Sequence, residues 1–116
     1  MDLPPISKEM TQVLMERELV LVTDDERRPV TLRIGMPVQD VKTVGGFDWR
    51  CPVEFVGLST THPFAAVGMD ALQAVTLALF ASRAQAEAWE RETGGHFLWL
   101  DEPGHGLPSI DLTITA

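Results

Sequence analysis

GMDALQAVTLALFASRAQAEAWERETGG, residues 68–95, is the stretch of sequence around which the rest of the chain is expected to fold. It is rich in Ala and Leu, which favour helix formation, and it contains no proline. Asp70 is well placed to cap the N-terminus of a helix, and Gln73 follows at the spacing of a capping box. Gly94 stands where a left-handed residue commonly ends a helix. One long helix is therefore predicted between these caps.

The two halves of this predicted helix differ in polarity. Residues 71–81 are apolar except for Gln73 and Thr76, and so wide an apolar surface predicts burial on more than one side. From Ser82 onward, charged residues appear between alanines, so the second half is expected to have a solvated face. The apolar run is too short to cross a bilayer, which needs roughly 20 residues.

The other segments have the patterns of strands and loops. Strands are expected over residues 18–23, 29–38, 49–58, 64–67, 96–100 and 109–115. A short helical turn is expected over residues 7–15, and residues 39–48 are expected to be a connection. Pro52 cannot donate to a strand ladder, so its strand is expected to be an edge or to be bulged there.

The predicted strands before the helix follow one another without helices between them, and this order favours antiparallel pairing. We predict an α+β fold in which an antiparallel meandering sheet of five to six strands has one long helix packed across one face. Residues 1–116 are expected to be a single domain with residues 1–6 loosely ordered. The C-terminal strand, residues 109–116, alternates strictly in polarity and is expected to pair within its own sheet or with another subunit.

The charge balance limits the possible partners. The net charge is −8, from 17 acidic and 9 basic residues. This balance opposes binding to nucleic acids and to anionic membrane surfaces, and it is compatible with a basic protein partner. A single cysteine excludes an internal disulfide, and the N-terminus lacks the features of a signal peptide. A cytoplasmic location is expected.

No catalytic residue, cofactor site or metal site is predicted. Cys51 is interpreted as a buried structural thiol. A reactive thiol would need a base beside it, and a zinc site would need His62, His96 or His105, but none of these stands at a close ligand spacing.

The helix carries the remaining candidate residues. Asp70 and Gln73 are interpreted as capping residues, with a ligand-facing role as the alternative. Trp49 and Trp99 are expected in the core. Trp89 is expected either to close the end of the core or to anchor a partner, because tryptophan is enriched at interface hot spots. The candidate interaction surface comprises Glu87, Trp89 and Glu90.

Four segments together resemble a family of small bacterial proteins that is classed as a domain of unknown function. They are Ile34-Gly35-Met36-Pro37, the stretch from Trp49 to Leu58, the helix start from Gly68 to Val75, and Phe97-Leu98-Trp99-Leu100 followed by Gly106-Leu107-Pro108. The Gly-x-Asp-x-x-Gln-Ala element is the most specific part, and the resemblance covers roughly residues 16–108. It implies a bacterial cytoplasmic protein and no particular activity.

Two classes of function are compatible with these patterns. The first is a non-enzymatic interaction or accessory domain that forms a homodimer or binds a basic protein, for example as an immunity or antitoxin-like protein. The second is a small-ligand-binding domain or an enzyme with a pocket between helix and sheet. The second class predicts a cavity near the helix N-terminus, where an anion would be favoured.

Overall fold

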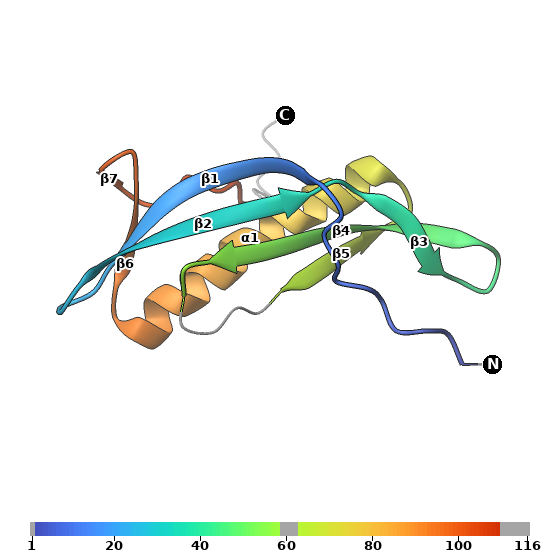
Figure 1. The fold of residues 1–116 in the computed structure, drawn as a ribbon, viewed down its shortest axis with the longest axis horizontal. Coiled ribbons are helices and arrows are strands. Elements are labelled where there is room, and N and C mark those ends of the chain that lie inside the picture. Colours follow the sequence, from blue (N-terminus) through green and yellow to red (C-terminus); the bar gives the residue numbers. More distant parts are fainter. Residues whose placement is uncertain (1, 59–62, 110–116) are drawn as a thin grey trace, which may run out of the picture.

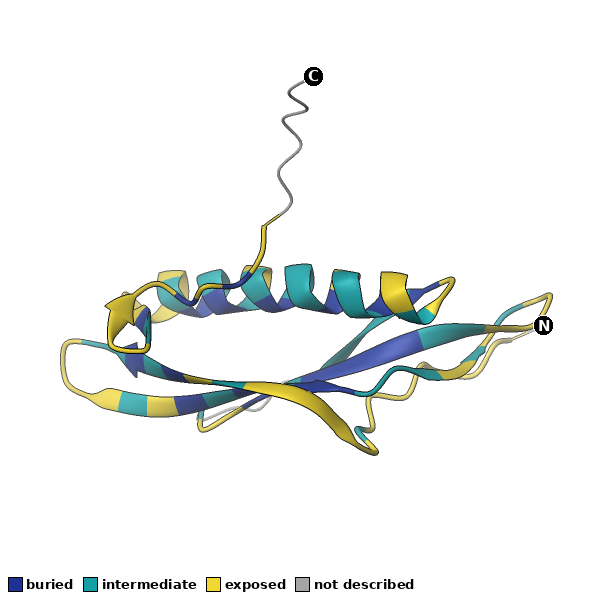
Figure 2. Cartoon of the chain, turned by 90° about the horizontal axis from the view of Figure 1, so that it is seen from above, coloured by how far each residue is buried: buried dark blue, intermediate teal, exposed yellow. Residues whose placement is uncertain are grey.

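The computed structural model describes residues 2–58 and 63–109, in which one helix packs on one face of a seven-stranded antiparallel sheet (Figures 1 and 2). The elements in chain order are β1 (Val13–Val22), β2 (Arg27–Gly35), β3 (Val38–Lys42), β4 (Phe47–Val56), β5 (Phe64–Gly68), α1 (Ala71–Thr93), β6 (His96–Trp99) and β7 (Glu102–Pro103). The α+β class and the antiparallel sheet are confirmed, and the strands number seven where five to six were expected.

Strand β4 is the centre of the sheet because three strands pair with it. Strand β2 pairs with its C-terminal part, β3 pairs with its N-terminal part, and β5 pairs with its middle on the other side. Strand β1 pairs with β2 along nearly its whole length, but β6 pairs only with Val20–Val22 of β1. The two-residue β7 pairs with β6. One long stretch of β1 therefore lies beyond the end of β6.

Pro52 lies in this central strand, not at an edge of the sheet. The pairing of β3 with β4 extends to Arg50, and the pairing of β2 begins at Val53. On this side of β4, Pro52 thus falls where one partner strand gives way to the next, so its missing amide proton interrupts neither of these two ladders. On the other side, Pro52 lies opposite Ala65 of β5. In the same gap, the thiol of Cys51 donates to the carbonyl oxygen of Gly35 at 3.3 Å.

The core lies between α1 and the inner face of the sheet (Figure 2). The fully buried side chains of the sheet include Leu19, Val30, Leu32, Val53, Phe55 and Phe97. The helix meets them with residues spaced three or four apart, namely Ala74, Ala78, Ser82, Ala86 and Trp89. Four of these five side chains are small, so the helix backbone can approach the sheet closely. Trp89 closes the far end of this contact by packing edge-on against Phe55, with ring centroids 4.7 Å apart.

The first half of α1 is buried on one side only, and the expectation of burial on more than one side is wrong. Leu72 is 76% exposed and Met69, just before the helix, is 81% exposed. The physical reason is the two-layer architecture: the sheet covers one side of the helix, and no second layer of the described chain covers the other (Figure 2).

The predicted helical turn at residues 7–15 is also wrong, since β1 already begins at Val13 and no helix precedes it in the described residues. The N-terminal segment is held extended by Arg50, whose side chain is buried. Its NH1 group donates to the carbonyl oxygen of Glu9 at 2.6 Å, while its Nε and NH2 groups donate to Asp40 at 2.7 and 3.1 Å. A bidentate contact of this kind is strongly directional.

The prediction that residues 39–48 form a connection is wrong, because β3 covers Val38–Lys42 and β4 begins at Phe47. The ion pair of Asp40 with Arg50 joins β3 to β4 and supplies the attraction that apolar residues usually provide. The predicted C-terminal strand at residues 109–116 lies outside the described residues, apart from Ser109, which is in no strand.

Gly68 links β5 to α1 at a point where a side chain has no room. A Cβ atom there would lie 2.5 Å from the amide nitrogen of Ala74 and 2.9 Å from the carbonyl carbon of Gln73. Because these are backbone atoms of the helix, we expect Gly68→Ala to lower the free energy of unfolding by about 1–3 kcal/mol. Urea denaturation followed by circular dichroism measures the change.

The matched control is Gly45→Ala, because a Cβ atom at Gly45 meets nothing within 4 Å. It should unfold at the wild-type urea concentration. Equal midpoints for the two variants would show that the helix start is not tightly packed on β5.

Candidate functional site

Asp70 and Gln73 both use their side chains to bind backbone amides at the N-terminus of α1. The amide of Gln73 donates to Oδ1 of Asp70 at 2.7 Å, and Oε1 of Gln73 accepts from the amide of Met69 at 2.7 Å. At the other end, Gly94 has the left-handed conformation, with φ of 71°. Both polar side chains at the N-terminus are thus engaged in capping, although Gln73 accepts from the amide of Met69, where a capping box would use that of the N-cap residue Asp70.

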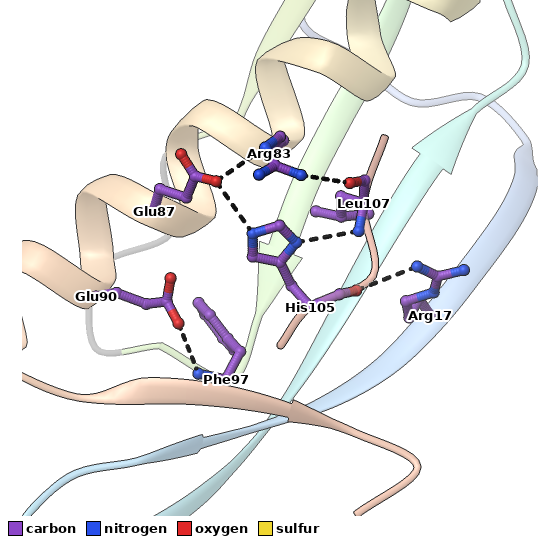
Figure 3. Close-up of polar contacts among 7 residues, drawn as sticks. All are labelled: Arg17, Arg83, Glu87, Glu90, Phe97, His105 and Leu107. Carbon is purple, nitrogen blue, oxygen red and sulfur yellow. Dashed lines mark hydrogen bonds and ion pairs between the residues drawn. The ribbon is translucent and has the colours of Figure 1, made fainter. Parts of the chain in front are cut away.

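Glu87, Trp89 and Glu90 all make contacts within the molecule. Trp89 is only 6% exposed, so its indole belongs to the core. Oε2 of Glu90 accepts from the amide of Phe97 at 2.9 Å. Oε1 of Glu87 lies 2.8 Å from Nε of Arg83 and 3.4 Å from Nε2 of His105 (Figure 3). These carboxylates hold the chain that follows the helix.

His105 is the centre of this arrangement and is buried. Its Nδ1 atom accepts from the amide of Leu107 at 3.0 Å, so the ring proton belongs on Nε2, which faces Glu87. The carbonyl oxygen of His105 accepts from Arg17 of β1 at 3.1 Å, and that of Leu107 accepts from Arg83 of α1 at 2.9 Å. Residues 105–107 are therefore fixed between the helix and the sheet (Figure 3).

Gly106 and Trp99 together allow the loop to follow this path. Gly106 has φ of 67°, which favours glycine, and a Cβ atom there would overlap the ring of Trp99. The guanidinium of Arg17 lies 3.8 Å from the centre of the Trp99 ring and forms a cation–π contact with it. Trp99 therefore packs against the core and also supports the loop.

The loop borders an apolar groove between α1 and the inner face of the sheet. The groove has a volume of about 210 Å³. Its lining consists of Met15, Leu32, Ile34, Leu79, Leu107 and Pro108, together with Glu16 and Arg17. It lies beside the middle of the helix, not at the helix N-terminus where the second class of function predicted a cavity.

The groove opens beside an unpaired strand edge. Because β6 pairs only with Val20–Val22, no strand in the described part of the chain pairs with that edge of β1 over residues 13–18. Val13, Leu14 and Met15 are each about 40% exposed. A strand edge with free amides, free carbonyls and exposed apolar side chains is a template for pairing with another chain. Sequence patterns alone do not reveal this open edge, because it exists only where β6 ends before it reaches residues 13–18 of β1.

The other candidate groups do not gather near this groove. Cys51 is fully buried in the core, and burial raises the pKa of its thiol from 9.0 to about 11. His96 is exposed at the start of β6, and His62 lies outside the described residues. Among residues 2–58 and 63–109, no group of three or more His, Cys, Asp or Glu side chains is placed to hold a metal ion.

Fold and groove together define an α+β domain with an open, apolar sheet edge beside its single described helix. The chain belongs to the family described as a domain of unknown function, DUF6968, whose model matches residues 15–109. This match confirms the expectation that residues 16–108 belong to a family of unknown function. The chain matches no curated protein and no solved structure. No helix in the described residues is long and apolar enough to cross a membrane.

The buried thiol predicts a pH dependence of stability. The unfolded chain releases the thiol proton near pH 9, whereas the folded chain retains it until about pH 11. Stability should be unaffected by this group below pH 9 and should fall by up to about 3 kcal/mol as the pH rises to 11. Urea denaturation at several pH values measures this decrease.

Cys51→Ser is the matched control, because a serine hydroxyl can donate to the Gly35 carbonyl oxygen but does not titrate in this range. The difference in stability between wild type and variant should narrow as the pH rises. A constant difference from pH 8 to pH 11 would contradict the assignment of a neutral, buried thiol.

The contact between His105 and Leu107 predicts the exchange behaviour of one amide. His105→Ala removes the acceptor of the Leu107 amide, and a buried donor left unpaired costs about 1–3 kcal/mol. Hydrogen exchange of this amide, measured by NMR, should become at least about tenfold faster.

His105→Asn is the control, because the Asn side-chain oxygen can take the place of Nδ1 while the contact to Glu87 is lost. Leu107 should then remain protected. Unchanged exchange in His105→Ala would mean that the loop is held by Arg17 and Arg83 alone.

Proposed function

We propose that this protein is a non-enzymatic interaction domain that binds an extended peptide segment along the open edge of β1. The observation that carries this proposal is the coincidence of a strand edge that no described strand pairs with and an apolar groove beside it. An edge supplies hydrogen bonds along the backbone, and a groove supplies selectivity for side chains. Domains that add a peptide as an extra strand use both features.

The dimensions of the groove favour side chains of a strand over a separate small molecule. Alternate residues of a strand point to the same face and are about 7 Å apart. An apolar cavity of about 150 Å³ accepts a benzene-sized group, so a groove of about 210 Å³ suits one large or two small aliphatic side chains. Met15, which lines the groove, is itself about 40% exposed.

The polar groups beside the groove favour binding over catalysis. Arg17 is engaged with the carbonyl of His105 and the ring of Trp99, and Glu87 is engaged with Arg83 and His105. Catalysis needs polar groups that converge on a reacting atom. Here, the groups close to the groove converge on the protein's own loop, so the enzyme alternative gains no support from them.

Charge favours a basic partner. With a net charge of −8, the protein attracts positively charged segments and accelerates their association. A narrower form of the proposal is an immunity-like role in the bacterial cytoplasm, in which the bound strand belongs to a basic protein. The buried single cysteine is compatible with a reducing compartment.

The binding proposal is tested by titrating ¹⁵N-labelled protein with the capped peptide Ile-Thr-Leu-Lys-Ile-Thr. We expect the largest amide shifts over residues 13–18 and at Leu107, because the peptide pairs with β1 and fills the groove. Met15→Glu should weaken binding at least about tenfold, because it places a charge in the groove.

Leu72→Glu is the matched control, since it introduces the same charge at an exposed apolar residue of α1 away from the groove. It should bind the peptide as wild type does. Shifts confined to β5 or to the outer face of α1, or equal binding by both variants, would overturn the proposal.

A further inference from the structure

We infer that the segment that occupies the β1 edge is residues 110–115 of a second copy of this chain, so that two copies exchange C-terminal strands. This inference rests on the strand-edge binding in the proposed function, and it takes a second copy of the chain as the partner in place of a basic protein. Each copy would donate one segment and accept the other around a two-fold axis. Such reciprocal exchange closes the assembly at two copies.

The sequence of the segment matches the chemistry of the groove. Ile110, Leu112 and Ile114 alternate with Asp111, Thr113 and Thr115. A strand with this pattern presents three aliphatic side chains on one face, and the groove lined by Met15, Leu32, Ile34 and Leu79 has room for one of them. The open edge spans residues 13–18 and the alternating segment spans residues 110–115, so the two have equal length.

The polar face of the segment also suits the outer face of β1. On that face, the hydroxyl of Thr31 already donates to the carboxylate of Glu18, with distances of 3.0 and 3.2 Å. Thr113 and Thr115 would lie on the same face of the extended sheet as Glu16 and Glu18. Threonine is also favoured in strands, and cross-strand hydrogen bonds of this kind stabilise pairing.

The path of the described chain favours a second copy over the segment's own copy. Leu107 and Pro108 border the groove, but Pro108 and Ser109 lie beside Phe80 and Ala84 on the far side of the helix. The chain therefore runs past the groove and away from β1 when it reaches Ser109 (Figure 2). To reach β1 of the same copy, the next residues would have to reverse at once, whereas a segment from a second copy meets no such constraint.

The first test is the mass of the full chain in solution, measured by light scattering after size-exclusion chromatography. The wild type should be a dimer. Met15→Glu and Leu112→Lys should each weaken dimerisation at least tenfold, because one places a charge in the groove and the other places a charge on the segment's apolar face. Far-UV circular dichroism should match that of the wild type, which separates loss of the dimer from loss of the fold.

Two control variants carry the same changes on other faces. Leu72→Glu alters the exposed surface of α1, and Thr113→Lys alters the polar face of the segment. Both should remain dimers. If Leu72→Glu breaks the dimer and Leu112→Lys does not, the helix face is the interface, and the inference is overturned.

Mixing the two monomeric variants gives the decisive measurement. The Met15→Glu chain retains a normal segment, and the Leu112→Lys chain retains a normal groove. Their mixture should form a heterodimer with one of the two crossings intact, detected by native mass spectrometry. A contact between identical faces would not be restored by mixing, so absence of the heterodimer would overturn the inference.

Two measurements distinguish a failure of the strand exchange from a failure of the proposed peptide binding. A wild-type chain that stays monomeric at millimolar concentration overturns the strand exchange. Titrating the Leu112→Lys variant with the peptide Ile-Thr-Leu-Lys-Ile-Thr then reports on the groove alone. Binding there with no wild-type dimer leaves the peptide-binding function standing with a different partner, whereas absence of binding removes both.

Discussion

The close contact between α1 and the sheet is the interaction on which the rest of the structure depends. Ala74, Ala78, Ser82 and Ala86 place almost no side-chain volume between the helix backbone and the inner face, and Trp89 fills the wider space at the far end. This contact fixes the distance of α1 from the sheet and the direction of its axis. It therefore also fixes the positions of the polar residues on the helix. Arg83, Glu87 and Glu90 then lie within reach of the returning chain, so the loop is held and the groove acquires its wall.

The sequence was informative where local chemistry determines structure. Helix caps depend on residues only a few positions apart, so Asp70, Gln73 and Gly94 mark the ends of α1 correctly. It was uninformative where distant pairing determines structure. Strand β3 depends on the contact of Asp40 with Arg50, and the extended N-terminal segment depends on the same arginine. The open edge of β1 depends on β6 ending at Trp99, and nothing in the sequence of β1 itself reveals this. The two glycines that flank His105 allow a close turn, but the sequence does not show that Gly106 is left-handed or that it packs against the Trp99 ring.

The distribution of charge follows from the same contacts. Arg17, Arg28, Arg33, Arg50 and Arg83, which are five of the nine basic residues, are engaged with carboxylates or carbonyl oxygens of the protein itself. Their guanidinium groups stabilise loops and neighbouring strands and are not gathered into a patch for phosphate groups. The field outside the molecule is therefore set by carboxylates.

The break opposite Pro52 has a consequence for the way the sheet opens. Since β2 and β3 hold different parts of β4, the hydrogen-bond ladder on this side is divided into two blocks joined only by the short link at Met36-Pro37. The outer block, with β3 and the N-terminal segment, is held mainly by polar contacts, whereas the inner block lies under the helix. On the other side of β4, strand β5 pairs with Trp49–Val53 and spans this division, so the cohesion of the two blocks depends on β5.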